Sequence, residues 1–382
     1  MKTSKLFSIK PPVFKPPAFM PPAFRPPVLL CLFFAFICGS AAAQTKTAPS
    51  LSGVIAGVDR YGNVRTSLTA EAFAQAGFEL GDMLRLETGN FKGELPLVTT
   101  YADVQRGNPL VRINNGAAEI SISYGNFSQA NAAGEGASVT ISLAAKGAYK
   151  AELEIRNLKR TEVRSDYSSD AVFANFRELR LGGIPANILY RSCHPALGDA
   201  RAPYAARLAE LAKIATVINL ADTAEELPSR AASDPWYKTI IEKKNIIALG
   251  MGVDYKSPDF AVKLKSGLEF MLTRNPPYLV HCNEGKDRAG VTAALLGALM
   301  GASPNEIVDD YMLSYVNYYG VAKGEERYGL ISAIMLDILK DFNGGIAPNS
   351  GQTVGAAEKY LQGVVGFSPA QIAALKLKLA GK

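Results

Sequence analysis

Residues 278–300 combine an apolar strand pattern, a polar loop and a run of small and apolar residues typical of a helix. The strand pattern Tyr-Leu-Val-His ends at His281, and the helical pattern begins at Gly290. A tight passage from strand through loop to helix lets successive backbone N–H groups converge on an anion, next to the helix N-terminus. The segment therefore predicts an α/β fold with an anion-binding loop for this half of the chain.

The same half of the chain alternates strand and helix patterns. Further strands are predicted at residues 188–190, 216–220 and 246–249. Helices are predicted at residues 204–213, 259–273, 290–300, 303–318, 328–342 and 368–379. Strands that are joined through helices run parallel in a sheet that the helices cover. We therefore expect an α/β domain with a central, mainly parallel sheet flanked by helices.

The first half has short alternating stretches, such as residues 83–87 and 138–143, separated by turn sequences. This pattern is typical of a small antiparallel barrel, and a single helix is expected at residues 69–76. The predicted organisation has four parts: a signal peptide with a proline-rich start at 1–43, a β-barrel domain at 44–156, a linker at 157–170 and an α/β domain at 171–382.

The signal peptide is predicted from charge and hydropathy. Residues 1–43 contain five lysine or arginine residues, no acidic residue and an apolar run at residues 28–38 followed by small residues. Cleavage is expected near Ala43, and the apolar run is too short to span a membrane, which takes about 20 residues. We expect an exported chain, periplasmic or secreted, without a transmembrane anchor after cleavage.

Charge and composition exclude several functional classes. The formal net charge is +6, but five positive charges lie in residues 1–43, so the rest of the chain predicts no nucleic-acid partner. The chain has two histidines and four cysteines, of which Cys31 and Cys38 lie in the predicted signal. Only Cys193 and Cys282 remain, so no disulfide framework, metal centre or other cofactor is expected.

Cys282 opens the polar loop and Arg288 closes it. The converging N–H groups and the helix dipole stabilise a thiolate, which makes Cys282 the candidate nucleophile. Arg288 can hold two phosphoryl oxygens, Gly285 lets the backbone approach closely, and Lys286 adds a cation for highly charged phosphates. The expected phosphate-binding residues are Asn283, Glu284, Gly285, Lys286, Asp287, Ala289 and Gly290.

The loop sequence His-Cys-Asn-Glu-Gly-Lys-Asp-Arg-Ala-Gly resembles that of bacterial secreted tyrosine phosphatases with dual protein and phosphoinositide specificity. Residues 176–183, 189–192, 307–314 and 360–368 support the resemblance, which spans residues 171–382. It implies a phosphatase that forms a phosphocysteine intermediate without a metal. The implied substrates are phosphorylated proteins, phosphoinositides or soluble inositol phosphates.

Two positions depart from the pattern of that family. Ala289 follows the loop arginine, where the family usually has a serine or threonine whose hydroxyl supports the thiolate as leaving group. This departure supports an alternative function, a module that binds phosphate ligands without hydrolysing them. The family's Asp-Leu-Arg after the second strand is replaced by Asn219-Leu-Ala221, and Asp222 is the candidate substitute.

A phosphatase of this kind needs a general acid that protonates the leaving oxygen. Asp254 is the first candidate, because it lies between a predicted strand and a predicted helix and resembles the acid loop of dual-specificity phosphatases. Asp287, inside the phosphate loop, is the rival. Asp259 is the third candidate, with helix capping as its simpler explanation.

Other residues near the motif have a functional and a simpler interpretation. The resemblance implies that His281 tunes the Cys282 thiolate through loop hydrogen bonds. Arg191 and Ser192 either position the loop or only end a strand. Cys193 is either a small buried residue or a redox partner of Cys282, since low-pKa thiols oxidise readily.

The first half resembles the C-terminal β-barrel of S-adenosylmethionine hydroxide adenosyltransferases in residues 53–66, 100–107 and 119–127. That family's catalytic domain has no room between the predicted signal and the barrel, so we do not expect its reaction. Tyr61, Asn63 and Asn126 are either turn residues or the lining of a nucleoside-sized pocket. A barrel that binds a nucleoside or a partner protein, with an accessory phosphatase domain, is therefore a further alternative.

Overall fold

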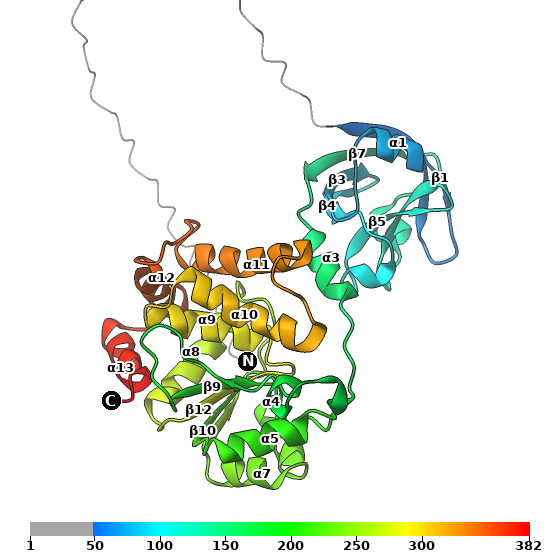
Figure 1. Cartoon of the computed structure of the whole chain (residues 1–382). Helices are drawn as coiled ribbons and strands as arrows, with labels where there is room; N and C mark the ends of the chain where they lie inside the picture. The colour runs from blue at the N-terminus through cyan, green and yellow to red at the C-terminus, as the bar shows by residue number, and fades with distance from the viewer. Residues whose placement is uncertain (1–48) are drawn as a thin grey trace, which may run out of the picture. The chain divides into compact units, whose positions relative to one another are not determined.

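The computed structural model describes residues 49–382, and the predicted signal peptide lies outside the described residues. The described chain forms an all-β region followed by an α/β region (Figure 1). Both regions were expected, so the predicted fold class is confirmed. Among residues 49–382, no helix is long and apolar enough to cross a membrane.

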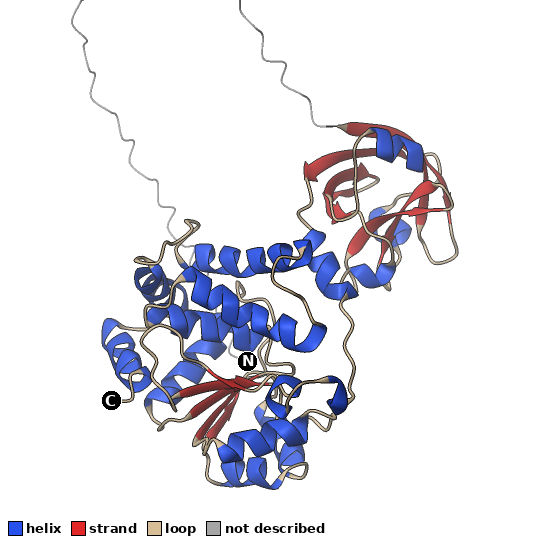
Figure 2. Ribbon diagram, in the orientation of Figure 1, coloured by secondary structure: helices blue, strands red, loops and turns tan. Residues whose placement is uncertain are grey.

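Antiparallel strands form the first region (Figure 2). They are β1 (Ser50–Val58), β2 (Val64–Thr69), β3 (Met83–Thr88), β4 (Phe91–Pro96), β5 (Pro109–Asn114), β6 (Ala117–Ile122) and β7 (Ser138–Ala145), in the order β4-β3-β7-β1-β2-β6-β5. Alternate side chains of β2 are buried, as expected for a strand with one face on a core. An isolated bridge between Leu97 and Val111 brings the ends of the sheet together, so the barrel is nearly closed.

Short helices accompany the barrel strands. The predicted helix is present as α1 (Ala70–Gln75), and its N-cap is the Thr69 side chain. The expectation of a single helix is wrong, because α2 (Phe127–Asn131) follows Asn126, which caps it. A third helix, α3 (Lys150–Asn157), follows β7 and buries none of its residues fully, although Leu153 and Ile155 pack against apolar clusters.

A mainly parallel sheet forms the centre of the α/β region, as predicted. Its strands are β8 (Arg177–Glu178), β9 (Leu189–Ser192), β10 (Thr216–Asn219), β11 (Ile246–Ala248) and β12 (Tyr278–His281). The order is β11-β10-β12-β9-β8, and only the short β8 pairs antiparallel to its neighbour. Because β12 is the central strand, the loop after it lies at the middle of the sheet's carboxyl edge.

The helices of the α/β region match the predicted ones within two residues at each end. The short helices α4, α6, α7 and α12 were not predicted, because eight residues or fewer show little periodicity. The helices are α4 (Asp170–Phe173), α5 (Ala202–Leu211), α6 (Leu227–Ala231), α7 (Pro235–Glu242), α8 (Pro258–Leu272), α9 (Arg288–Leu299), α10 (Pro304–Tyr319), α11 (Glu326–Phe342), α12 (Thr353–Tyr360) and α13 (Pro369–Leu379).

Helices cover both faces of the sheet (Figure 2). Tyr278 and Val280 of β12 belong to the larger apolar core, with residues of α8 and α9. Leu279 points to the other face, where it packs with residues of α5 and α7. This burial of both faces explains why the central strand is continuously apolar before His281.

Candidate active site

The predicted phosphate loop lies between β12 and α9. Cys282 is buried at its start, and α9 begins at Arg288. Gly285 has a φ of +68°, and a Cβ atom there would lie 2.2 Å from the carbonyl oxygen of Ser192. Only glycine fits this position, because the loop turns against the end of β9 in a left-handed conformation.

Arg191 of β9 holds the outer side of the loop. Its buried guanidinium donates to the carbonyl oxygens of Gly285 (2.6 Å) and Lys286 (3.0 Å). In a trans peptide the N–H points away from the carbonyl, so the next two N–H groups point toward the inner side of the loop. Asp310 of α10 forms ion pairs with Arg191 and Arg177. Burial raises the pKa of Asp310, but the two arginines outweigh burial and hold the pKa below its ordinary value.

Ser192 was a candidate, with Arg191, for positioning the loop, but its side chain makes no hydrogen bond to the loop. Its buried hydroxyl donates to the carbonyl oxygen of Cys193 (2.6 Å) and not to the loop. The backbone supports the loop here, because the His194 N–H donates to the Asn283 carbonyl oxygen (3.0 Å). After Arg191, the chain that follows β9 therefore contacts the loop through its main chain.

His281 lies behind Cys282 in a buried polar cluster that contains both histidines of the chain. Nε2 of His281 is 3.0 Å from the Tyr237 hydroxyl oxygen, and the His194 ring lies edge-on with 4.6 Å between centroids. Burial, followed by the neighbouring His194, holds the pKa of His281 well below its ordinary value, so this ring is neutral near pH 7.

His194 and Asp222 extend this cluster, and the sequence did not single out His194. Nε2 of His194 is 2.7 Å from Oδ2 of Asp222, and Arg230 donates to Oδ1 (3.0 Å). Burial raises the pKa of Asp222, but the hydrogen bonds from His194 and Arg230 lower it below its ordinary value. Asp222 is thus a buried, charged anchor for His194. A usable signal existed, since one of the two histidines ends a predicted strand and the other lies four residues after the predicted strand at 188–190.

Arg288 reaches from the start of α9 to the predicted acid loop. Its Nη1 donates to the carbonyl oxygen of Met251 (2.9 Å). Its Nε is buried without a partner among the residues that the structure describes. A bound oxyanion would satisfy this donor.

Asp254, the first candidate for the general acid, is exposed on the loop between β11 and α8. Its Oδ1 accepts a hydrogen bond from the Lys256 N–H (3.0 Å). The loop is anchored to α11, because the Tyr255 hydroxyl donates to Asp341 (2.6 Å) and Lys256 pairs with the same carboxylate (2.8 Å). The structure thus places Asp254 on a solvent-facing turn, near the Met251 carbonyl that Arg288 contacts.

The other two candidates for the general acid, Asp287 and Asp259, have different surroundings. Asp287 stands at the N-cap position of α9, half exposed, with its carboxylate 3.7 Å from Nζ of Lys286. Asp259 lies in the first turn of α8 and pairs with Lys263 (2.9 Å); its interpretation as the helix cap is wrong, because the Ser257 side chain caps α8. Asp254 and Asp287 remain the candidates.

The ammonium group of Lys286 is covered by other side chains of the site. Its buried ammonium lies over the rings of Tyr315 (5.0 Å) and Tyr319 (5.5 Å) and 3.4 Å from the Glu284 carboxylate. Burial lowers the pKa of Lys286, but Asp287 and the other nearby acidic groups raise it above its ordinary value. Its charge is therefore already paired inside the loop.

Ala289 and Gly290 lie in the first turn of α9. Ala289 is fully buried and brings no hydroxyl to the loop. The Thr292 hydroxyl donates to the Arg288 carbonyl oxygen (3.0 Å), so it does not replace the missing group. A Cβ atom at Gly290 would lie 3.1 Å from Nη2 of Arg191, so this glycine leaves room for the arginine.

Cys193 and Cys282 are both buried free thiols, but they pack in different apolar clusters. Cys193 packs with Ala174 and Ala205. Burial raises the pKa of its thiol, which disfavours the reactive thiolate. These observations favour a small buried residue over a redox partner.

The barrel region has a cavity of about 690 Å³. Tyr61 and Asn63 line it, together with Tyr101 and Tyr124. Asn63 also has a turn role, because its N–H and side-chain amide donate to Asp59 (2.9 and 2.8 Å). The pocket and turn interpretations therefore both hold for Asn63, while Asn126 caps α2 and does not line the cavity.

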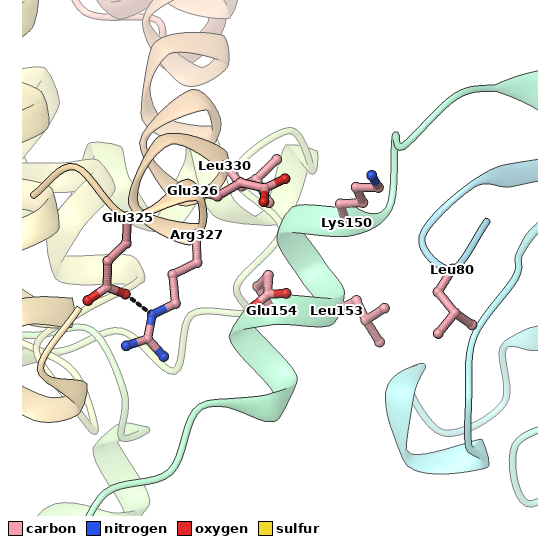
Figure 3. Close-up of a pocket in the computed structure, with 8 residues that line it drawn as sticks. All are labelled: Leu80, Lys150, Leu153, Glu154, Glu325, Glu326, Arg327 and Leu330. Carbon is pink, nitrogen blue, oxygen red and sulfur yellow. Dashed lines mark hydrogen bonds and ion pairs between the residues drawn. The ribbon is translucent and has the colours of Figure 1, made fainter. Parts of the chain in front are cut away.

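A second hollow of about 460 Å³ lies beside α3 and the start of α11 (Figure 3). Glu325 and Arg327 form an ion pair on its α11 side. The hollow is lined by Leu80, Lys150, Leu153, Glu154, Glu325, Glu326, Arg327 and Leu330, so it contains no nucleophile. Neither here nor elsewhere in residues 49–382 do three His, Cys, Asp or Glu side chains gather in a way that holds a metal ion.

Comparison with known proteins agrees with this geometry. The model of the tyrosine phosphatase family matches residues 172–381, more than half of the chain. The chain belongs to the tyrosine phosphatase family. The model of the SAM hydroxide adenosyltransferase C-terminal domain matches residues 53–140. Both resemblances seen in the sequence are confirmed, and the family supports a phosphatase.

Three solved structures are similar to parts of this phosphatase-family chain. An uncharacterized conserved protein from Thermotoga maritima is 27% identical, over 25% of this chain and 37% of that chain, with a TM-score of 0.24. A conserved hypothetical protein from Thermus thermophilus is 23% identical, over 24% of this chain and 34% of that chain, with a TM-score of 0.19. The chain thus spans about a third of the length of each.

The third structure is the core catalytic domain of the PP-IP phosphatase SIW14 from S. cerevisiae in complex with citrate. It is 22% identical, over 41% of this chain and 83% of that chain, with a TM-score of 0.27. No curated protein matches the chain.

Proposed function

We propose that this protein is an exported, cysteine-dependent phosphatase that hydrolyses phosphomonoesters through a phosphocysteine intermediate. One observation carries the proposal: in the loop between β12 and α9, Cys282 stands at the start, two carbonyl oxygens face outward to Arg191, and Arg288 stands at the end. The inward N–H groups and the N-terminus of α9 favour a phosphoryl group beside the cysteine.

In the first step, the Cys282 thiolate attacks the phosphorus atom of the substrate. The S–P bond forms as the P–O bond to the leaving group breaks, and the leaving oxygen takes a proton from the general acid. Arg288 exchanges its bond with the Met251 carbonyl for the equatorial phosphoryl oxygens, whose charge it stabilises.

In the second step, water attacks the phosphorus atom of the phosphocysteine. The S–P bond breaks, inorganic phosphate leaves, and the thiolate is restored while the same acidic residue takes the proton from water. Ala289 offers no hydroxyl to the departing sulfur, so the second step is expected to limit turnover.

Asp254 is the proposed general acid, with Asp287 as the rival. Met251, whose carbonyl oxygen Arg288 contacts, lies three residues before Asp254 on the same loop. Asp254→Asn and Asp287→Asn are compared on aryl phosphates whose leaving groups differ in pKa. For the true acid, the loss of kcat/KM grows as the leaving group becomes more basic; a loss independent of the leaving group rejects that residue.

The proposed substrates are phosphotyrosine in proteins and phosphoinositides or soluble inositol phosphates, outside the cytoplasm. The sequence resemblance to secreted phosphatases of dual specificity supports this range. A panel of phosphopeptides, phosphoinositide vesicles and inositol phosphates, assayed for released phosphate with the purified mature chain, ranks these classes.

The central test is loss of hydrolysis on two substitutions. Cys282→Ser and Arg288→Ala are each expected to lower kcat/KM for an aryl phosphate by about 10³-fold or more. Vanadate inhibits the parent enzyme, and EDTA does not. Activity that survives both substitutions would disprove the proposal.

Two alternatives have a specific observation in their favour. Ala289 favours a module that traps phosphate without turnover, and a stable phosphoenzyme burst without steady release would support it. The barrel cavity with Tyr61 favours nucleoside binding. Calorimetry of adenosine on the whole mature chain, with Tyr61→Ala as control, tests that alternative.

A further inference from the structure

The predicted linker supplies a charged side chain to the phosphate loop. Nη1 of Arg160 lies 2.7 Å from Oε1 of Glu284, at an angle that makes the contact an ion pair rather than a directed hydrogen bond. Arg160 lies outside residues 172–381, the part that matches the tyrosine phosphatase model. The contact therefore brings a residue from outside the family domain to its catalytic loop.

Arg160 is held rigidly at this place. Its guanidinium lies over the Tyr318 ring, 4.8 Å from the centroid, and its side chain is 21% exposed. The buried Arg201 lies over the same ring at 4.6 Å and donates to the carbonyl oxygen of Thr161 (2.6 Å). Glu162 pairs with both arginines, at 3.1 Å from Arg160 and 2.9 Å from Arg201. Little side-chain entropy remains to be lost, unlike in a usual surface ion pair.

Glu284 is fixed from the loop side as well. Its carbonyl oxygen accepts hydrogen bonds from the Tyr318 hydroxyl (2.9 Å) and from Nδ2 of Asn175 (3.1 Å). Its carboxylate, 30% exposed, is shared between Arg160 and Lys286. Because Tyr318 both stacks on Arg160 and bonds to the Glu284 backbone, the linker and the loop rest on one scaffold.

Without Arg160, the charges of the neighbouring loop side chains Glu284, Lys286 and Asp287 do not balance. Lys286 lies 3.4 Å from the Glu284 carboxylate and 3.7 Å from the Asp287 carboxylate, so these three side chains together carry one negative charge. Arg160 brings the group to neutrality. Burial lowers the pKa of Arg160, but Glu284 and the nearby phenol groups raise it above its ordinary value, so the positive charge persists. A phosphoryl dianion approaching the loop then meets no net negative charge from these four side chains.

We propose that Arg160 is a positioning residue of the phosphate loop, which fixes Glu284 and screens its charge so that the linker completes the oxyanion-binding site. The kinetic consequence rests on the proposed phosphatase function. The binding consequence does not, because vanadate binding is measured without turnover. The predicted signature is weaker oxyanion binding with a nearly unchanged chemical step.

The test uses the full mature chain and the substitution Arg160→Ala. KM for an aryl phosphate is expected to rise about tenfold with kcat within about twofold, and calorimetric vanadate affinity to fall by a similar factor. The difference shrinks at high ionic strength, since salt screens the uncovered Glu284 charge. Adding Glu284→Gln to Arg160→Ala restores most of the affinity. Arg164→Ala is the matched control, because that linker arginine pairs with Asp170 and should change neither constant.

Several outcomes would overturn the inference. Unchanged vanadate affinity in Arg160→Ala rejects it while leaving an active phosphatase intact. A loss that is insensitive to salt and is not restored by Glu284→Gln shows a structural role only and also rejects it. A parent chain that binds vanadate without hydrolysing an aryl phosphate rejects the phosphatase, and the calorimetric comparison still decides the role of Arg160. A parent that binds no vanadate rejects both. If Arg160→Ala does not fold, Arg160→Gln keeps the stacking on Tyr318 and carries the same test.

Discussion

The barrel and the α/β region bury different charged groups, because the barrel buries the carboxylates of Asp82, Asp103 and Glu119 while the α/β region also buries arginines. In the α/β region, Arg191 and Arg201 are fully buried, and both lie near the phosphate loop or the linker that contacts it. In the barrel, the cavity is lined by aromatic rings that face solvent, with Tyr61 60% and Tyr124 81% exposed. Buried charge costs free energy unless it is paired, so its concentration marks where a site is held rigid for chemistry. The open barrel cavity suits binding instead.

The comparison predicts its largest effect at Arg191. Arg191→Met leaves two loop carbonyl groups without their partner and Asp310 with Arg177 alone, so the free energy of unfolding should fall by about 3–5 kcal/mol. Hydrolysis should fall about 10²-fold or more, because the loop N–H groups lose their orientation. Urea unfolding measures the loss of stability, and an aryl phosphate assay measures the loss of hydrolysis.

The matched barrel change is Arg85→Met. It removes an exposed ion pair with Glu94 (2.8 Å) and should cost less than about 1 kcal/mol, with no effect on hydrolysis. Equal losses of stability at the two positions would break the contrast between the regions.

Acid should destabilise the α/β region, because His281 is fully buried there. The folded-state pKa of His281 is well below its ordinary value, so above about pH 6.5 the histidine is neutral in both states and its contribution is complete. Below that pH only the unfolded state takes up the proton, and unfolding becomes easier by up to about 1.4 kcal/mol per pH unit. Urea midpoints at pH 7, 6 and 5 should therefore fall. His281→Asn should reduce the dependence of the urea midpoint on pH. An unchanged dependence would contradict the assignment of this effect to His281.

Ala289→Ser should have a smaller, opposite effect on turnover. A hydroxyl that hydrogen-bonds the departing Cys282 sulfur should raise kcat about threefold to tenfold, the scale of one hydrogen bond. The phosphoenzyme burst should shrink in rapid-quench measurements. Ala294→Ser, at another buried position of α9, is the control and should leave the burst unchanged. A burst that persists in both variants would show that the missing hydroxyl does not limit turnover.

The smallest effect is expected in the barrel cavity. Tyr61→Ala should change kcat/KM for an aryl phosphate by less than about twofold, because the ring is exposed and has no part in the phosphate loop. A loss as large as that expected for Arg160→Ala would show that the barrel takes part in the reaction.

Local features of the site could be predicted from sequence, because short-range geometry determines them. The strand end at His281, the turn at Gly285 and the helix beginning by Gly290 follow one another along the chain, and β12 has the predicted bounds. The same holds for the alternating strands of the barrel and for Thr69 as a helix cap.

Residues that meet across the fold could not be predicted in this way. His194 meets Asp222 only because β9 and β10 flank β12 in the parallel sheet. Lys286 was expected to face the phosphate, but the rings of Tyr315 and Tyr319 on α10 cover it. No spacing in the sequence records these contacts.

The sequence by itself determined the fold class, the family and the Cys282–Arg288 loop, since each depends on residues that are neighbours along the chain. The tertiary structure alone decided which charges surround that loop. Arg160 and Glu284 are far apart in sequence, and their 2.7 Å contact exists because Arg201 and Tyr318 hold the linker against the α/β region. The physical reason is the strength of charge pairing in a partly buried site, which depends on distance in space and not along the chain.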